Sequence, residues 1–202
     1  MLPAIVTLFA FLCGSLPISV WLGKLLLHRD VRRVGDGNPG AANVFRAGGK
    51  LVGLLALLLD VSKAAAPVGW AYFNLGYRGV SMFCIALAPM LGHVFSPFLG
   101  FKGGKAIATA LGVWIGLTFW KASLPGVLCV SLGIAFFDAP GWAVMTALAG
   151  ILMALLLWLP DPLLFAVWAG EVFILAWTHR DDLRRPPQLR RWAKRFFHPV
   201  KG

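Results

Sequence analysis

Charged residues are scarce in this sequence. Asp, Glu, Lys and Arg together make up 13% of the 202 residues, whereas 59% of the residues are hydrophobic, and the mean hydropathy is +0.78. These values lie outside the range of an ordinary soluble domain. We therefore expect an integral membrane protein.

Cysteine is also rare, and its positions exclude two kinds of site. Cys13, Cys84 and Cys129 each lie in an apolar run without a CxxC pair or a neighbouring His, so we interpret them as small core hydrophobes. The sequence contains no cluster of metal ligands, no GxGxxG that follows a strand, and no GxxxxGK loop. We expect no metal and no cofactor. It also lacks a fixed-period repeat and a low-complexity linker, which favours one polytopic membrane domain over 1–202.

Long hydrophobic runs, in contrast, are abundant, and a helix needs about 20 apolar residues to cross the hydrocarbon core. Three segments of that length carry no charged residue: 1–23, 79–101 and 139–160. Four more are short or contain a charge: 51–77 with Asp60 and Lys63, 106–120, 122–137, and 162–178 with Glu171. Residues 1–23 could instead be a signal peptide, but the run is too long and lacks a basic start. We expect an all-α fold of seven transmembrane helices.

Positive charge is distributed unevenly along the chain. Of the 19 Lys and Arg residues, six lie in 24–50 and eight in 179–202, and basic residues in short loops favour the cytoplasmic side. Six predicted spans separate these regions, so both can be cytoplasmic. We expect the N-terminus outside and a basic cytoplasmic tail at 179–202. The net charge of +11 suits a bilayer with anionic headgroups, so neither nucleic acid nor an obligate protein partner is implied.

Three polar stretches fall on this predicted cytoplasmic face: GDGNPGAANVFR at 35–46, GHVFSPFLGFKGGKAIAT at 92–109 and THRDDLRR at 178–185. Glycine permits backbone turns that point several N–H groups at one anion, and a helix that starts after such a loop adds its positive end. Arg46 and Lys105 supply full charges for phosphate oxygens. Together the stretches predict a phosphate-binding site.

Each polar stretch also has a purely structural interpretation. The glycine-rich stretch could be a turn between helices, KGGK could be a topology anchor, and His179 with Arg180 could complement a helix C-terminus. The RRWAKRFF segment of the tail is typical of a basic, aromatic segment that lies on lipid headgroups. The occurrence of all three stretches on one face favours the functional interpretation.

The order and spacing of these elements resemble the acyl-phosphate-dependent glycerol-3-phosphate acyltransferases of bacterial membranes. Five segments carry the resemblance: GSLP at 14–17, DVRRVGDGNPGAANVFR at 30–46, LLDVSK at 58–63, GHVFSPFLGFKGGKAIAT at 92–109 and HRDDLRR at 179–185. The corresponding family patterns are GSxP, DIRxxGSGNxGATNxxR, LLDxxKG, GHxFPxFxxFKGGKGxAT and HRxNIxRLxxGxE.

The resemblance implies a seven-helix enzyme of the bacterial inner membrane. Such an enzyme moves a fatty acyl group from acyl-phosphate to the 1-hydroxyl of glycerol 3-phosphate, and releases phosphate and lysophosphatidic acid. The HxxxxD motif of other acyl-glycerol acyltransferases is absent here. Because acyl-phosphate is already activated, positioning and charge neutralisation can supply most of the rate, and a substrate phosphate oxygen can accept the proton.

The candidate catalytic residues are Arg46 and Lys105, which would hold glycerol phosphate, and His179 and His93, which would orient or polarise a substrate. His93 could equally be a helix-packing histidine. We expect the amides of 37–43 to cradle the acyl-phosphate group. The candidate substrate-binding residues are Asp36, Gly37, Asn38, Gly40, Ala41, Asn43, Lys102, Gly103, Gly104 and Asp182.

Among the departures from the family patterns, three alter polar side chains of the predicted site. Asp36 stands where the pattern has Ser, Ala42 where it has Thr, and Asp182 where it has Asn. The RYxSLxS element of the family is not recognisable in 134–144, and the final Glu is missing. Two carboxylates thus enter a predicted anion site, which leaves open whether the acceptor has changed.

The acidic residues therefore need partners. We expect Asp36 to pair with Arg32, Arg33 or Arg46, or to accept a substrate hydroxyl. Glu171 lies inside an apolar span, where a carboxylate is normally paired, protonated or functional, and a residue such as Lys63 is a candidate partner. Three functions remain open: the acyltransferase, an acyltransferase with a changed acceptor, and a non-catalytic protein that binds or moves a phosphorylated lipid.

Overall fold

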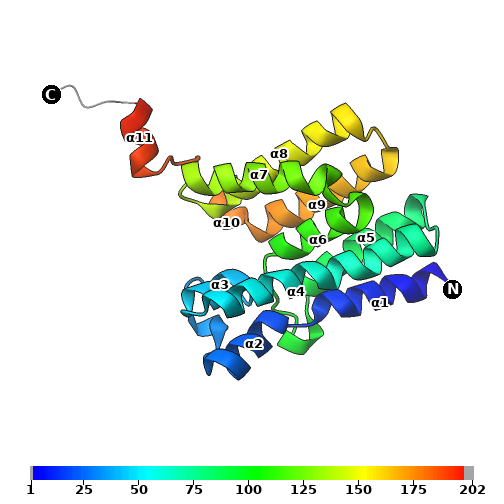
Figure 1. The fold of residues 1–202 in the computed structure, drawn as a ribbon, viewed down its shortest axis with the longest axis horizontal. Coiled ribbons are helices and arrows are strands. Elements are labelled where there is room, and N and C mark those ends of the chain that lie inside the picture. Colours follow the sequence, from blue (N-terminus) through cyan, green and yellow to red (C-terminus); the bar gives the residue numbers. More distant parts are fainter. Residues whose placement is uncertain (1, 198–202) are drawn as a thin grey trace. The chain divides into compact units, whose positions relative to one another are not determined.

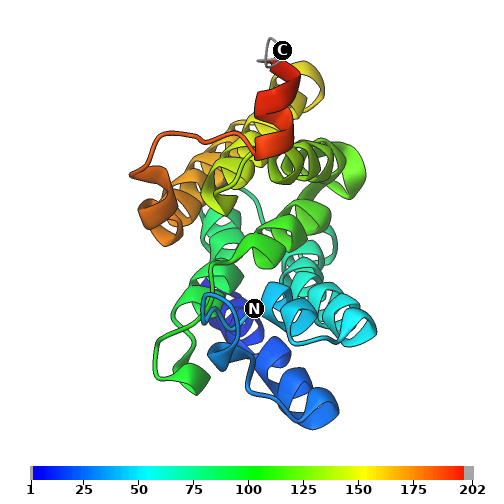
Figure 2. The same cartoon turned by 90° about the vertical axis from the view of Figure 1, so that its left-hand side faces the viewer.

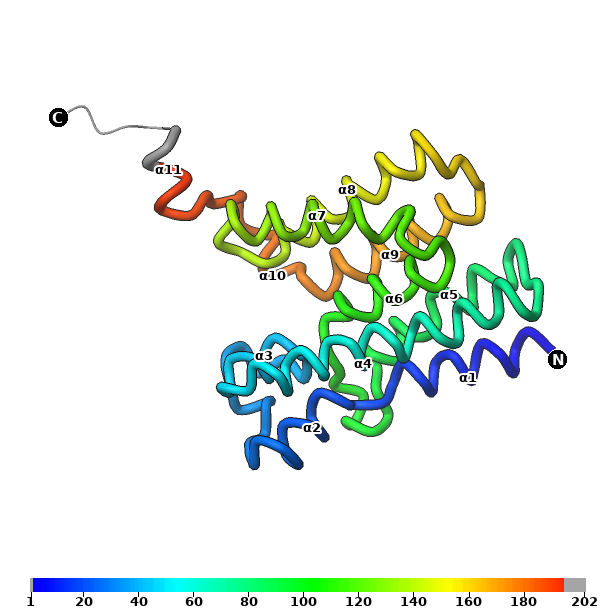
Figure 3. Tube along the Cα trace, in the orientation of Figure 1, coloured from blue at the N-terminus to red at the C-terminus, as the bar shows by residue number. Residues whose placement is uncertain are grey.

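The computed structural model describes the backbone of residues 2–197 and the side chains of residues 2–194 (Figure 1, Figure 3). Within this part of the chain every regular element is a helix, apart from an isolated bridge between Phe137 and Leu189. The helices form two compact units, Met1–Trp120 and Lys121–Gly202. Residues 198–202 of the predicted tail lie outside the described residues. The predicted all-α class is confirmed.

The apolar helices of the described chain coincide with the predicted spans. Four are long and apolar enough to cross a membrane: Pro3–Leu27, Lys50–Asn74, Gly79–Leu99 and Pro140–Trp158. Three are shorter: Ile107–Thr118, Trp120–Phe136 and Pro162–Thr178. These three helices have 12, 17 and 17 residues and rise about 18 to 26 Å, against a hydrocarbon core of about 30 Å. Four spans are thus supported by length, and the three shorter helices remain predicted spans.

The first predicted span is interrupted. α1 (Pro3–Ser15) ends just before Pro17, and α2 (Ile18–Leu27) starts directly after it (Figure 1). Proline has no N–H to donate, and its ring clashes with the preceding helical turn. The segment 1–23 is therefore not one continuous helix, because the GSLP element contains a helix break.

Side chains from later segments, Ser96 after α5 and Lys63 in α4, satisfy the carbonyl groups at this break. Ser96 Oγ donates to the carbonyl of Ser15 at 2.6 Å, and Lys63 Nζ donates to the carbonyl of Leu16 at 2.8 Å. Within a membrane, backbone groups that a proline frees need such partners. The break thus fastens the first helix to the two segments that carry Lys63 and Ser96.

The other helices of the first unit are α3 (Ala41–Arg46), α4 (Lys50–Gly69), α5 (Gly79–Val94) and α6 (Ile107–Thr118), with a π-helical turn at Trp70–Asn74 and a 3-10 turn at Pro97–Leu99. α1 packs along α5, and α4 packs along α6. A Cβ on Gly14 would overlap the backbone of Pro89, and one on Gly112 would overlap the carbonyl of Val61. Such small residues let membrane helices approach closely.

The short helix α3 connects the glycine-rich loop to α4. α3 lies beside the first turns of α4 in both views (Figure 1, Figure 2). Buried Val20, Val31, Val44 and Ala56 form an apolar cluster beneath this loop. The cluster fixes the glycine-rich loop on the ends of α2 and α4.

The second unit contains the remaining helices: α7 (Trp120–Phe136), which begins at the last residue of the first unit, α8 (Pro140–Trp158), α9 (Pro162–Thr178), α10 (Arg180–Leu183) and α11 (Arg191–Phe197). The start of the predicted tail is tied to the end of α7. Arg190 Nε donates to the carbonyl of Phe137 at 3.1 Å, and Trp192 Nε1 donates to the carbonyl of Ala135 at 3.1 Å. Arg190 and the first turn of α11 are therefore held by hydrogen bonds to the end of α7 and the residue after it.

Candidate functional site

The segment that precedes the glycine-rich loop is ordered by its own side chains. α2 ends at His28 in the left-handed conformation, with φ of 52°. Asp30 then caps the 3-10 turn Val31–Arg33 by accepting from the Arg32 amide. The Arg32 side chain donates to the same carboxylate at 2.6 Å, and this bond lowers the pKa of Asp30 to about 2. Arg32 is thus paired with Asp30.

Asp36, Asn43 and Arg46 form the polar centre of the glycine-rich loop. The buried Asn43 donates from Nδ2 to Asp36 Oδ1 at 3.1 Å, and its Oδ1 accepts from Arg46 Nη1 at 2.8 Å. Arg46 Nη1 also lies 3.4 Å from Asp36 Oδ1, so Arg46 is the one of the three candidate arginines that pairs with Asp36 in the structure. Gly35, with φ of 59°, permits this packing, because a Cβ there would lie 2.6 Å from Asn43 Oδ1 and 2.8 Å from Arg46 Nη1.

The amides of this loop are used within the loop. Four of them donate to neighbouring oxygens: Gly37 to the carbonyl of Val34, Gly40 to that of Asn38, Asn43 to that of Gly40, and Asn38 to Asp36 Oδ1. Ala41 is the first residue of α3 and is buried. The sequence predicted that the amides of 37–43 hold phosphate. In the structure these four amides donate within the loop, and phosphate binding by the amides of 37–43 stays a prediction.

Lys105, from the loop after α5, reaches the carboxylate of Asp36. Its Nζ donates to Asp36 Oδ2 at 3.1 Å. Partial burial raises the pKa of Asp36, but hydrogen bonds from Lys105, the Asn38 amide and Asn43 outweigh this effect, so the pKa lies below its usual value of 3.8. Asp36 therefore carries a negative charge at neutral pH and lies between two cations, Lys105 and Arg46.

The KGGK segment is folded back onto the end of α5. The amides of Gly103 and Gly104 donate to the carbonyls of Val94 and His93 at 2.9 and 3.0 Å. Ala106 follows with φ of 64°, a left-handed conformation that costs a residue with a side chain free energy. This path turns Lys105 toward the glycine-rich loop. Lys102, three residues earlier, is exposed on the loop.

A series of buried polar side chains extends from this loop into the helices. His93 Nδ1 lies 2.9 Å from Lys63 Nζ, and Lys63 Nζ lies 2.7 Å from Asp60 Oδ1. Asp60 Oδ2 accepts from Ser19 Oγ at 2.6 Å. An ammonium group can only donate, so His93 Nδ1 accepts and the proton of the neutral ring is on Nε2. The other side of the ring lies against Gly104, where a Cβ would overlap Nε2.

These contacts give His93 a place between Lys63 and the loop that carries Lys105. Sequence reasoning missed Ser19, because a serine in an apolar helix carries no local signal of its partner. Asp60 and Lys63 had such a signal, since opposite charges three residues apart on one helix face each other. Lys63, which we considered as a partner of Glu171, is paired with Asp60.

Two candidate residues belong to the second unit, and each has a hydrogen bond there. His179 Nδ1 lies 2.9 Å from the carbonyl of Leu175. A carbonyl can only accept, so the neutral ring carries its proton on Nδ1 and its lone pair on Nε2. Asp182 Oδ2 accepts from the Gly141 amide at 2.9 Å. Because Gly141 lies in the first turn of α8, this carboxylate caps that helix, a role that the sequence did not indicate.

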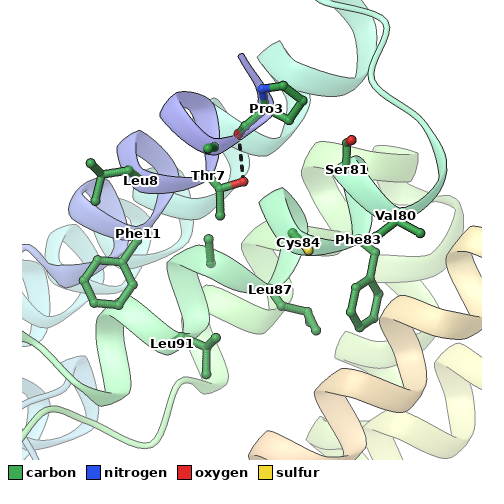
Figure 4. Close-up of a pocket in the computed structure, with 12 residues that line it drawn as sticks. Pro3, Thr7, Leu8, Phe11, Val80, Ser81, Phe83, Cys84, Leu87 and Leu91 are labelled. Carbon is green, nitrogen blue, oxygen red and sulfur yellow. Dashed lines mark hydrogen bonds between the residues drawn. The ribbon is translucent and has the colours of Figure 1, made fainter. Parts of the chain in front are cut away.

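An open apolar groove of about 720 Å³ runs along α1 and α5 (Figure 4). Its walls include Leu8 and Phe11 of α1 and Leu87 and Leu91 of α5. The hydroxyl of Thr7, one of the few polar groups there, donates to the carbonyl of Pro3 at 2.9 Å, as the dashed line in Figure 4 shows. The groove thus presents hydrocarbon almost throughout.

Comparison with known proteins identifies the family of this chain. The family model described as glycerol-3-phosphate acyltransferase matches residues 4–187. A glycerol-3-phosphate acyltransferase of Anaeromyxobacter dehalogenans strain 2CP-1 is 40% identical over 194 residues, which cover 92% of this chain and 94% of the relative. That of Aromatoleum aromaticum strain EbN1 is 40% identical over 184 residues, which cover 88% of this chain and 89% of the relative.

Two crystal structures of PlsY, an integral membrane glycerol 3-phosphate acyltransferase, share the fold. The glycerol 3-phosphate form is 28% identical, with a TM-score of 0.81 over 97% of this chain and 99% of that chain. The lysophosphatidic acid form is 29% identical, with a TM-score of 0.80 over 91% and 90%. The resemblance seen in the sequence is therefore confirmed: this chain belongs to the glycerol-3-phosphate acyltransferase family and is a multi-pass membrane enzyme of that family.

Proposed function

We propose that this protein transfers a fatty acyl group from acyl-phosphate to the 1-hydroxyl of glycerol 3-phosphate, and releases lysophosphatidic acid and phosphate. The observation that carries the proposal is the convergence of Arg46, from α3, and Lys105, from the loop before α6, on one anionic group, Asp36. Two cations that share an anion are arranged as a phosphate requires. The PlsY forms with glycerol 3-phosphate and with lysophosphatidic acid support the acceptor and the product.

The chemistry needs little from the protein beyond positioning and charge. The 1-hydroxyl oxygen attacks the carbonyl carbon of acyl-phosphate and forms the ester C–O bond. The bond from that carbon to the phosphate oxygen breaks, and the phosphate leaves with the electron pair. A phosphate oxygen of a substrate accepts the hydroxyl proton. Arg46 and Lys105 hold the phosphate of the acceptor and neutralise charge as the reaction proceeds.

The two histidines have different parts in this proposal. His93 is a positioning residue, since its ring lies between Lys63 and the backbone of the loop that carries Lys105. His179, which belongs to the second unit, stays a candidate for orienting or polarising a substrate, as the resemblance of HRDDLRR to the family pattern implies. The acyl chain remains in apolar surroundings, such as the groove along α1 and α5.

The proposed topology is one polytopic membrane domain of seven spans in the bacterial inner membrane. The N-terminus lies outside, and 179–202 is a cytoplasmic tail. This arrangement puts the basic segment 24–50 and the tail on the same, cytoplasmic side, as the distribution of Lys and Arg requires.

The test of the activity is direct. Purified protein in detergent is supplied with acyl-phosphate and glycerol 3-phosphate, and lysophosphatidic acid is measured by mass spectrometry. A parallel reaction with acyl-CoA as donor tests whether the phosphate of the donor is required. We expect product with acyl-phosphate and little with acyl-CoA. Absence of product with acyl-phosphate would refute the proposal.

A further inference from the structure

Asp36 occupies the position at which this site would hold an anion. Its carboxylate accepts from four donors: Lys105 Nζ at 3.1 Å, Arg46 Nη1 at 3.4 Å, Asn43 Nδ2 at 3.1 Å and the Asn38 amide at 3.3 Å. Each of these donors belongs to a residue that we predicted from the sequence to bind substrate. The carboxylate therefore makes the contacts that a phosphate oxygen would make.

A substrate phosphate and this carboxylate would compete. Arg46 and Lys105 bring two positive charges to the cluster, and Asp36 cancels one of them. A phosphate monoester carries about 1.5 to 2 negative charges at neutral pH. Two anions that share the same cations repel each other at close range. Full binding of phosphate to Arg46 and Lys105 thus requires Asp36 to give up its own contacts.

We propose that Asp36 is a specificity-determining residue that acts as a tethered competitor of phosphate for Arg46 and Lys105. The inference rests on the proposed function, because it assigns these two cations to the substrate phosphate. With no ligand bound, the carboxylate orients both cations. When phosphate binds, the carboxylate turns to solvent, which the 43% exposure of its side chain allows.

The competition acts on affinity rather than on the chemical step. A site whose competent form is populated only part of the time binds its ligand more weakly in proportion to that fraction. The same factor applies to each phosphate group that uses these cations, which includes inorganic phosphate, a product of the reaction. Asp36 therefore raises KM for the acceptor and weakens inhibition by inorganic phosphate to a similar extent.

The size of the effect follows from exposure. The side chains of Lys105 and Arg46 are 31% and 50% exposed, and exposed ion pairs are individually weak. Neutralising Asp36 is expected to tighten phosphate binding about tenfold rather than a thousandfold. Added salt is expected to reduce this difference, because it screens charges that water can reach.

The experiment measures binding of inorganic phosphate and of glycerol 3-phosphate to the purified full-length protein by titration calorimetry. Asp36→Asn keeps the shape of the side chain, and Asp36→Ser introduces the residue of the family pattern. Both variants are expected to bind both anions about tenfold more tightly than the wild type. Their KM for glycerol 3-phosphate falls by the same factor, kcat changes less, and inorganic phosphate becomes a stronger inhibitor.

Asp30→Asn is the matched control. It removes a carboxylate from the same connection between α2 and α3, but this carboxylate pairs with Arg32 rather than with Arg46 or Lys105. It is expected to leave phosphate binding unchanged. Unchanged binding in both Asp36 variants would overturn the proposal. Weaker binding would also overturn it and would indicate that Asp36 accepts a substrate hydroxyl.

Two further outcomes are decisive. A fall in kcat at constant KM would show that Asp36 acts in the transition state. Loss of a monodisperse size-exclusion peak in both variants would show that the fold depends on this carboxylate. That result would overturn the proposal, because a residue that only competes with phosphate is not needed for folding. Binding of inorganic phosphate needs no turnover, so failure of the wild type to form lysophosphatidic acid would refute the proposed function alone.

Discussion

Lys105 and Asp36 lie 69 residues apart in the chain, and a hydrogen bond of 3.1 Å from Nζ to Oδ2 joins them. This bond connects the KGGK segment to the glycine-rich loop. Arg46 approaches the other oxygen of the same carboxylate at 3.4 Å. The glycine-rich stretch 35–46 and the KGGK segment therefore share one cluster of charges. A substitution in either segment is expected to change the side-chain contacts of the other.

Removal of either cation should reduce activity strongly. Arg46→Ala and Lys105→Ala are each expected to lower kcat/KM by roughly 30-fold to several thousand-fold, because losing a charged hydrogen bond to bound phosphate costs about 2–5 kcal/mol. Lys102→Ala, at an exposed side chain of the same loop, is expected to have a milder effect if this residue mainly sets topology. The measurement is the rate of lysophosphatidic acid formation by each variant and by the wild type. If both cation variants keep wild-type rates, the phosphate site lies elsewhere.

The buried pair between Asp60 and Lys63 should behave as a coupled unit. Asp60→Asn or Lys63→Met alone leaves one buried charge without its partner, which costs about 3–5 kcal/mol. The double variant is expected to recover much of that loss, because neither charge remains. Thermal unfolding of all four proteins in detergent measures the coupling. Additive losses in the double variant would contradict a direct pair.

The Asp182 carboxylate should stabilise α8. Asp182→Ala removes the acceptor for the Gly141 amide, and an anion at a helix N-terminus is worth about 0.3–2 kcal/mol. Asp182→Asn keeps an oxygen acceptor without the charge, so its unfolding temperature is expected to lie between those of the wild type and the Ala variant. An Ala variant with an unchanged unfolding temperature would show that the Asp182 carboxylate does not stabilise α8.

Ala106 should be a position where glycine stabilises the protein. Its φ is 64°, and a left-handed residue with a Cβ costs roughly 1 kcal/mol more than glycine. The family pattern FKGGKG has glycine here. Ala106→Gly is expected to raise the unfolding temperature. Ala110→Gly, inside α6, is the opposite control and is expected to lower it by introducing glycine into a helix. Destabilisation by both would refute the prediction.

The topology can be tested with single cysteines. In a background without Cys13, Cys84 and Cys129, cysteines introduced at Lys50 and at Lys201 are both expected to resist an impermeant thiol reagent in intact cells. Both should react after the cells are opened, which controls for reactivity. Labelling of only one of them in intact cells would exclude an even number of spans between the two positions.

Local features of the sequence predicted much of this molecule. The apolar runs located the helices, because burial in lipid needs only composition and length. Asp60 and Lys63 could be recognised as charges inside such a run. Arg46 lies only ten residues after Asp36, at the end of the short helix α3, and this local connection brings the two side chains together. Pro17 also carried a local signal, although the span through it was treated as continuous.

Contacts between distant segments could not be predicted in the same way. Ser19 meets Asp60 across 41 residues, and Gly141 meets Asp182 across 41. Such pairs depend on the rotation and the offset of packed helices, which hydrophobic runs do not determine. The contact between Asp182 and α8 was therefore not predicted, and substrate binding by Asp182 stays a prediction. The hydrogen bonds that the loop amides make likewise depend on backbone φ values, which the spacing of the glycines does not determine.

The break at Pro17 constrains the order in which the chain can settle in the membrane. The carbonyls of Ser15 and Leu16 receive their hydrogen bonds from Ser96 and Lys63, which are 81 and 47 residues further along. Synthesis delivers the N-terminus first, and an unsatisfied carbonyl in hydrocarbon costs several kcal/mol. Until α4 and α5 are inserted, water must therefore reach these two oxygens. The broken first span can reach its final position only when α4 and the segment after α5 bring the donors that replace that water.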